Sequence, residues 1–269
     1  MDPRGLTRVL VIGAGVLILM GAATIVLRYG YGHDYARGLV PKFDLDRELN
    51  VPTWFSSGLL LCAAALLGII ASAKHAARDR FAPHWIGLAV IFTLLSMDET
   101  ASIHGLPGSQ LRAAFDLPGF LHFAWVIPGT VAVAVFAAAY LRFLLHLPPG
   151  TSRPIAAAGV LVAGGALGGE MAQGAYQTAY REDAIFGVIA LVEESLEMAG
   201  AIVFVHALTS YLQQQYGSVQ IAFAGPASRS QSGRSDGQNA KPAEVRAAFP
   251  TTTSGRQGRH QAAGYPLER

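Results

Sequence analysis

The feature that most constrains this chain is a series of six long apolar runs. A helix needs about 20 apolar residues, at 1.5 Å each, to cross a hydrocarbon layer about 30 Å thick. The six runs are Leu6–Leu27, Phe55–Ala73, Trp85–Met97 with a polar continuation to His104, Leu121–Leu145, Ile155–Tyr176 and Ala184–Leu212. Only 14% of the residues are charged, against about 25% in soluble domains. The sequence therefore predicts an all-α, polytopic membrane bundle of six transmembrane helices over residues 1–212, and it argues against a soluble enzyme.

The basic residues predict how these helices are oriented. Cytoplasmic loops are enriched in Lys and Arg, and 14 of the 20 basic residues lie on one side of the six-span arrangement. We therefore expect both termini on the cytoplasmic side of the inner membrane. The first run is expected to be a retained helix, because no clear small-residue cleavage site follows it. By contrast, 13 of the 18 acidic residues lie in outer loops or outer helix halves.

The composition changes abruptly after Leu212. From Gln213 the chain is rich in Ser, Gly, Gln, Arg and Pro, with no periodicity and almost nothing to bury. Such a segment gains too little from burial to offset the entropy lost on ordering. Residues 213–269 are therefore predicted to be a disordered cytoplasmic tail. We expect the lipid bilayer as a partner of the chain and no nucleic acid.

Acidic residues gather within three of the predicted helices, where each charge costs about 2.5–3.5 kcal/mol to insert. These acids are Asp98 and Glu99 in the third helix, Glu170 in the fifth, and Glu193, Glu194 and Glu197 in the sixth. Counting 1.5 Å per residue from the predicted inner ends places Asp98, Glu170 and Glu194 about 21, 24 and 27 Å along their helices. The three helices are therefore expected to bring their acids to one layer in the outer half of the membrane.

Glycines in the fifth helix favour a close approach of helices at this depth. Gly164, Gly165, Gly168 and Gly169 form two overlapping small-xxx-small pairs, a pattern typical of close helix packing in membranes.

Carboxylates together with an imidazole are typical ligands of iron, manganese or zinc in helix bundles. The sequence predicts a divalent metal ion (Fe, Mn or Zn) with five ligands and two further acids in catalytic roles. The predicted ligands are Asp98, His104, Glu170, Glu194 and Glu197, and the predicted catalytic residues are Glu99 and Glu193. On a regular helix His104 would point about 120° away from Asp98, so it joins the site only if the helix ends before it. His122 is a second candidate imidazole.

These residues favour a metal-dependent membrane enzyme that acts on a lipid-like or other apolar substrate. Both hydrolysis and oxidation stay open. The alternative is a proton- or cation-coupled transport protein, or an accessory subunit of a membrane complex, with no metal site. In a third interpretation the acids are protonated and form only structural hydrogen bonds. The chain has no P-loop, HExxH or G-x-S-x-G motif, so the corresponding soluble enzyme classes have no support.

Overall fold

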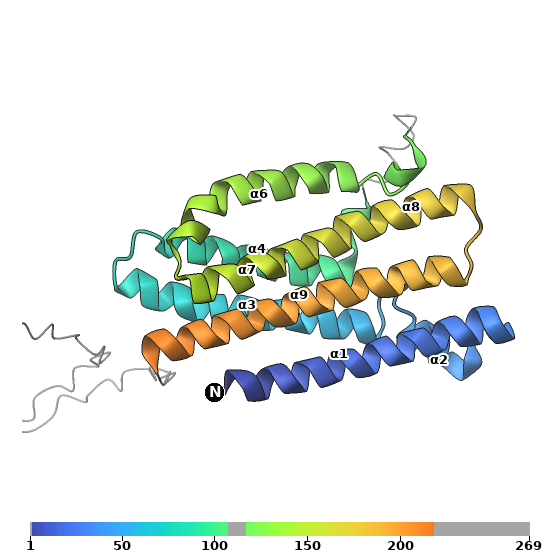
Figure 1. Ribbon diagram of the computed structural model, residues 1–269, viewed down its shortest axis with the longest axis horizontal. Helices are drawn as coiled ribbons and strands as arrows, with labels where there is room; N and C mark the ends of the chain where they lie inside the picture. The colour runs from blue at the N-terminus through green and yellow to red at the C-terminus, as the bar shows by residue number, and fades with distance from the viewer. Residues whose placement is uncertain (1, 107–116, 218–269) are drawn as a thin grey trace, which may run out of the picture. The chain divides into compact units, whose positions relative to one another are not determined.

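The computed structural model describes residues 2–106 and 117–217, which form helices and turns with no strand among them (Figure 1). The α-helices are α1 (Pro3–Ile25), α2 (Leu39–Phe43), α3 (Val51–Ala76), α4 (Ala82–Ala101), α6 (Val126–His146), α7 (Pro149–Ala163), α8 (Glu170–Ala179) and α9 (Ala184–Tyr216). A π-helical segment, Val26–Gly30, extends α1, and a second, Gly164–Gly169, joins α7 to α8. Short 3-10 turns occupy Ala36–Gly38, Ile103–Gly105 and Gly119–Leu121. The predicted all-helical fold is confirmed for the described residues.

All six predicted apolar segments contain a long helix. Four helical stretches are long and apolar enough to cross a membrane: Pro3–Gly30, Val51–Ala76, Val126–His146 and Pro149–Ala179. The other two helices, α4 with 20 residues and α9 with 33 residues, run along the same direction in Figure 1. The architecture is that of a helical membrane protein with four candidate spans.

The observed helix ends differ from the predicted ones at three places. α4 ends at Ala101, because Ser102 takes a left-handed conformation with φ 51°. α6 begins at Val126, after a turn that includes Gly119–Leu121. α9 continues to Tyr216, so the first four residues of the predicted tail are helical, and Tyr216 packs against the apolar core. The remainder of the predicted tail, 218–269, lies outside the described residues.

Polar side chains define where three of the helices begin. Asp2 accepts hydrogen bonds from the backbone N–H groups of Arg4 and Gly5 at the start of α1. Asn50 accepts one from Thr53 at the start of α3, and Asp183 caps α9 in the same way. These side chains satisfy N–H groups that have no partner within the helix.

The apolar core consists of two clusters, a larger one around Trp85 and Phe143 and a smaller one around Leu59 and Met198. We call the end where α1, α4 and α7 begin and α3, α6 and α9 end the basal end, and the opposite end the apical end (Figure 1). Near the basal end Trp85 packs edge-on against Phe143, with ring centroids 4.9 Å apart, and stacks on Tyr211 at 5.3 Å. α9 is the central helix, in contact with α1, α3, α7 and α8. The predicted acidic layer lies on the apical side of the larger cluster.

The outer surface of the bundle is apolar. Leu19, Leu145 and Val160 are each more than 70% exposed, although large aliphatic side chains are usually buried in soluble proteins. Such a surface suits a hydrocarbon environment.

Candidate functional site

The turn after α4 brings His104 back onto Asp98. Because Ser102 ends the helix, the next residues form a 3-10 turn over the last helical turn. The backbone N–H of His104 donates to Asp98 Oδ1 at 2.8 Å, and His104 Nδ1 lies 3.0 Å from Asp98 Oδ2. One carboxylate thus holds both the backbone and the ring of the histidine. The regular-helix geometry, which would have kept the two apart, does not apply.

Trp125 connects this pair to Glu170. Its ring lies against His104, with centroids 4.9 Å apart. Its indole N–H donates to Glu170 Oε1 at 3.2 Å, while Glu170 Oε2 is buried and accepts no hydrogen bond from the described residues. Elements at three places in the sequence, namely the turn after α4, the start of α6 and the start of α8, therefore meet here.

Two glycines let α9 place glutamates directly on the backbone of the π-helical segment. A Cβ built on Gly169 would lie 2.5 to 2.6 Å from side-chain atoms of Glu193, and one built on Gly165 would lie 2.8 Å from Glu197 Cγ. Glu193 is only 7% exposed, and it accepts a hydrogen bond of 2.7 Å from Gln173 Nε2. Apolar side chains would be the ordinary filling of such an interface. π-Helical segments inside helices are frequent at functional sites.

Five glutamates each lie within electrostatic range of at least two of the others, and we call them the carboxylate layer. They are Glu99 of α4, Glu170 of α8, and Glu193, Glu194 and Glu197 of α9. Of the basic side chains in the described part of the chain, only His104 is among their strongest electrostatic partners, and it acts on Glu99 and Glu170. Carboxylates repel one another at low dielectric unless protons or metal ions neutralise them. The layer therefore favours the binding of cations.

Three members of the layer, Glu99, Glu194 and Glu197, have no hydrogen-bond donor among the described residues, and we call them the open group. Glu99 is the strongest charged partner of Glu194, and Glu194 is the strongest charged partner of Glu197, followed by Glu99. None of the three accepts a hydrogen bond from the described residues, whereas Glu170 and Glu193 do.

The structure does not show a formed metal centre. Within residues 2–106 and 117–217, no three His, Cys, Asp or Glu side chains are arranged to hold a metal ion. His122 packs closely against Gly174 of α8, because a Cβ built on Gly174 would lie 2.9 Å from the Cβ of His122. The predicted residues are thus gathered in one region without converging on one point.

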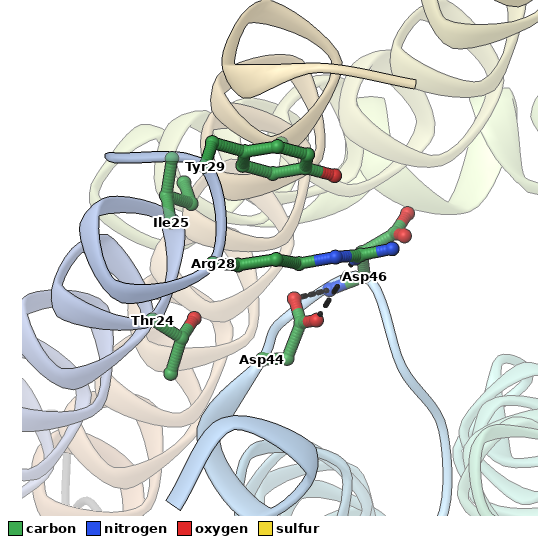
Figure 2. Close-up of a pocket in the computed structure, with 7 residues that line it drawn as sticks. Thr24, Ile25, Arg28, Tyr29, Asp44 and Asp46 are labelled. Atoms are coloured by element: carbon green, nitrogen blue, oxygen red, sulfur yellow. Dashed lines mark hydrogen bonds and ion pairs between the residues drawn. The ribbon is translucent and has the colours of Figure 1, made fainter. Parts of the chain in front are cut away.

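The partly buried side chain of Arg28 lies between the end of α1 and the loop that precedes α3 (Figure 2). Arg28 is 3.4 Å from Asp44, 3.6 Å from Glu182 and 3.9 Å from Asp34. The side chain of Asp44 is only 7% exposed, and Arg47 also pairs with it at 3.3 Å. Arg28 and Asp44 line a small pocket, in which Arg28 points toward Asp44 (Figure 2). The other residues that line it are Thr24, Ile25, Tyr29, Asp46 and Gly187. The ion pairs fasten the loop and the turn between α8 and α9 to the end of α1.

Sequence reasoning missed two hydrogen-bond donors of the site. Trp125 donates a hydrogen bond to Glu170, and Gln173 donates one to Glu193. Neither donor carries a charge, so a pattern of ionisable residues does not include them. The spacing gave one signal, because Gln173 is three residues after Glu170 and hence near it on the helix surface. Nothing in the sequence pointed to Trp125.

Comparison with known proteins places the chain in a family without giving it an activity. Neither the comparison with curated proteins nor the comparison with solved structures gives a match. A family model described as a domain of unknown function (DUF8692) matches residues 9–212. That range takes in α1 from Val9 onward, every residue of the carboxylate layer and most of α9. The chain therefore belongs to the DUF8692 family.

Proposed function

We propose that this protein spans the inner membrane six times, with both termini in the cytoplasm and the apical end outside. The four candidate spans and the common direction of α4 and α9 support this topology, as does the excess of basic residues in the basal loops. Reporter fusions test it. Fusions after Ala77 and Gln213 should report the cytoplasm, and fusions near Lys42 and Arg181 the outer side. An outer location for the Ala77 fusion would refute the topology.

The proposed activity is that of a metal-dependent membrane enzyme that acts on an apolar substrate at the carboxylate layer. The observation that carries this proposal is the open group Glu99, Glu194 and Glu197, which has no hydrogen-bond donor among the described residues. Carboxylate oxygens and an imidazole nitrogen suit Fe, Mn or Zn. In such a site a bound metal would supply Lewis acidity or activate water or oxygen.

His104 is oriented as metal-ligating histidines usually are. Such a histidine typically uses its second ring nitrogen in a hydrogen bond to a carboxylate, which fixes its orientation. Asp98 holds Nδ1 of His104, which leaves Nε2 for a ligand. In this proposal Asp98 orients the histidine rather than binding the metal. The four proposed ligands are His104, Glu99, Glu194 and Glu197, and they do not converge on one point. The three glutamates must therefore change rotamer when the metal binds.

Glu170 and Glu193 are suited to proton transfer in this proposal. Trp125 and Gln173 hold them beside the open group, and the unpaired Oε2 of Glu170 can give or take a proton. The substrate would approach from the bilayer, since the surface of the bundle is apolar.

Elemental analysis tests the proposal. The purified full chain, loaded in turn with Fe, Mn and Zn and then dialysed, should retain about one or two metal ions. The double variant Glu194→Gln/Glu197→Gln should lose them while it still inserts, because neutral side chains insert more easily. Glu182→Gln, at the turn before α9, is the matched control and should keep the metal. Wild-type protein that retains none of the three metals would refute the proposal.

A proton- or cation-transfer protein without a metal is the second candidate. One observation favours it, since Asp98, Glu170 and Glu193 already accept hydrogen bonds from protein side chains. A path across the membrane would also need polar groups in the basal half, which holds the apolar core around Trp85 and Phe143. A site open to one side only is the better fit, and it favours the enzyme.

A further inference from the structure

Within residues 2–106 and 117–217, the contacts of helix α6 with the rest of the bundle lie near its two ends. One stripe of α6 faces the bundle, as its contacts show. At the apical end Trp125 meets His104 and Glu170, and a Cβ on Gly129 would lie 3.2 Å from Leu167. At the basal end Tyr140 donates to the carbonyl oxygen of His84, and Phe143 is buried in the core.

The middle of the same stripe is uncovered. At 100° per residue, Ala132 and Phe136 lie within about 20° of the direction of Trp125. They should therefore be buried if the helices were in contact along their length. Ala132 is exposed, and Phe136 is 37% exposed. The uncovered stretch between Gly129 and Tyr140 is about 16 Å long.

The facing stripe of α4 leads from the basal contact up to the site. Gly87 contacts the hydroxyl group of Tyr140. Ile91, Leu94 and Asp98 follow Gly87 on the same face of α4, at intervals of four, three and four residues. Leu94 is 52% exposed. The uncovered apolar stretches of α4 and α6 therefore both end, apically, at the Asp98–His104 pair.

We propose that these two stretches hold the single long apolar chain of a substrate whose polar head carries no negative charge and reaches Asp98, His104 and Glu170. The inference rests on the proposed function and specifies its substrate class. The apolar walls match an acyl or isoprenoid chain, and the small side chain of Ala132 leaves room for it. The head carries no negative charge, because the carboxylate layer would repel an anion. The buried, unpaired oxygen of Glu170 can accept a hydrogen bond from a hydroxyl group.

Photolabelling of the full chain in phosphatidylcholine nanodiscs tests this. The probe is hexadecanol with a diazirine at mid-chain. Labelled peptides are mapped by mass spectrometry with and without excess unmodified hexadecanol, and the quantity measured is the labelling that this excess suppresses. Suppressible label is expected near Phe136 and Leu94. Ala132→Phe should reduce it about tenfold, since overfilling costs about 1–3 kcal/mol. Ala134→Phe, on the opposite face of α6, is the matched control and should leave it unchanged.

Either of two results would overturn the inference as a whole: no suppressible label in the wild-type protein, or an equal loss of label in both variants. Suppression by palmitate as strong as that by hexadecanol would refute a head without negative charge. Ala132→Leu, a smaller change, provides a second blocking variant if Ala132→Phe elutes as aggregate in gel filtration. Metal analysis of the same samples separates the two proposals. A variant that loses the label but retains its metal tests the chain-binding stretch alone. Metal-free protein with normal labelling would refute only the proposed metal.

Discussion

Replacing Gly169 by alanine should force α9 away from the π-helical segment. The new Cβ would lie 2.5 to 2.6 Å from Cβ, Cγ and Cδ of Glu193, whereas carbon atoms in contact prefer about 3.5–4.0 Å. The helices must therefore separate by about 1 Å. A rotamer change cannot relieve the contact, because Cβ of Glu193 is fixed by its backbone. Overpacking of this kind costs about 1–3 kcal/mol.

Gly168→Ala is the matched control for this prediction. It lies one residue away in the same segment, and its Cβ would meet nothing within 4 Å. Its higher helix propensity should make Gly168→Ala neutral or stabilising by up to about 1 kcal/mol. The difference is measured by heating both variants in detergent and recording the fraction of each protein that stays monodisperse. Equal melting temperatures for the two variants would refute the close packing of Glu193 on Gly169.

Three further predictions concern residues around the site. Trp125→Phe should destabilise the protein by about 1–3 kcal/mol, because it leaves a second oxygen of Glu170 buried without a donor; an unchanged melting temperature would contradict that hydrogen bond. Arg28→Ala should lower stability by about 1–3 kcal/mol, since the buried Asp44 then keeps Arg47 as its single ion-pair partner among the described residues. Asp34→Ala, at the exposed partner, should have little effect. A hydrogen bond from the hydroxyl group of Tyr176 is the main cause that lowers the pKa of Asp183. The stabilising contribution of this carboxylate is therefore complete above its unfolded pKa of about 3.9, and it is lost as the pH falls through the lower folded pKa. Asp183→Asn should therefore flatten the fall of melting temperature between neutral and acidic pH, and a parallel curve would refute the assignment.

The layer of acids was accessible from the sequence because depth along a helix follows from residue counts. Glu170 and Glu194 come from helices joined by one turn, so their separation from that turn predicted similar depths. The structure places them within electrostatic range of each other. The glycine pattern likewise predicted a close approach, and Gly165 and Gly169 are where α9 packs.

Details within the layer were not accessible in the same way. Whether His104 reaches Asp98 depends on the left-handed turn at Ser102, and serine is not a residue that signals such a turn. The choice of Gly165 and Gly169 over Gly164 and Gly168 depends on the rotation of the helix, which the π-helical segment alters. Periodicity based on a regular helix cannot predict either outcome.

The sequence by itself determined the class of this protein, because the length and hydropathy of the apolar runs depend only on local composition. It also determined which helices carry acids and roughly at what depth. Only the tertiary structure decided which carboxylates are held by donors and which are open, since the donors Trp125 and Gln173 come from other parts of the chain. It also decided that α6 meets the bundle at its ends and leaves Ala132 uncovered between them. Helix packing sets these contacts, and packing depends on pairs of surfaces that are far apart in the sequence.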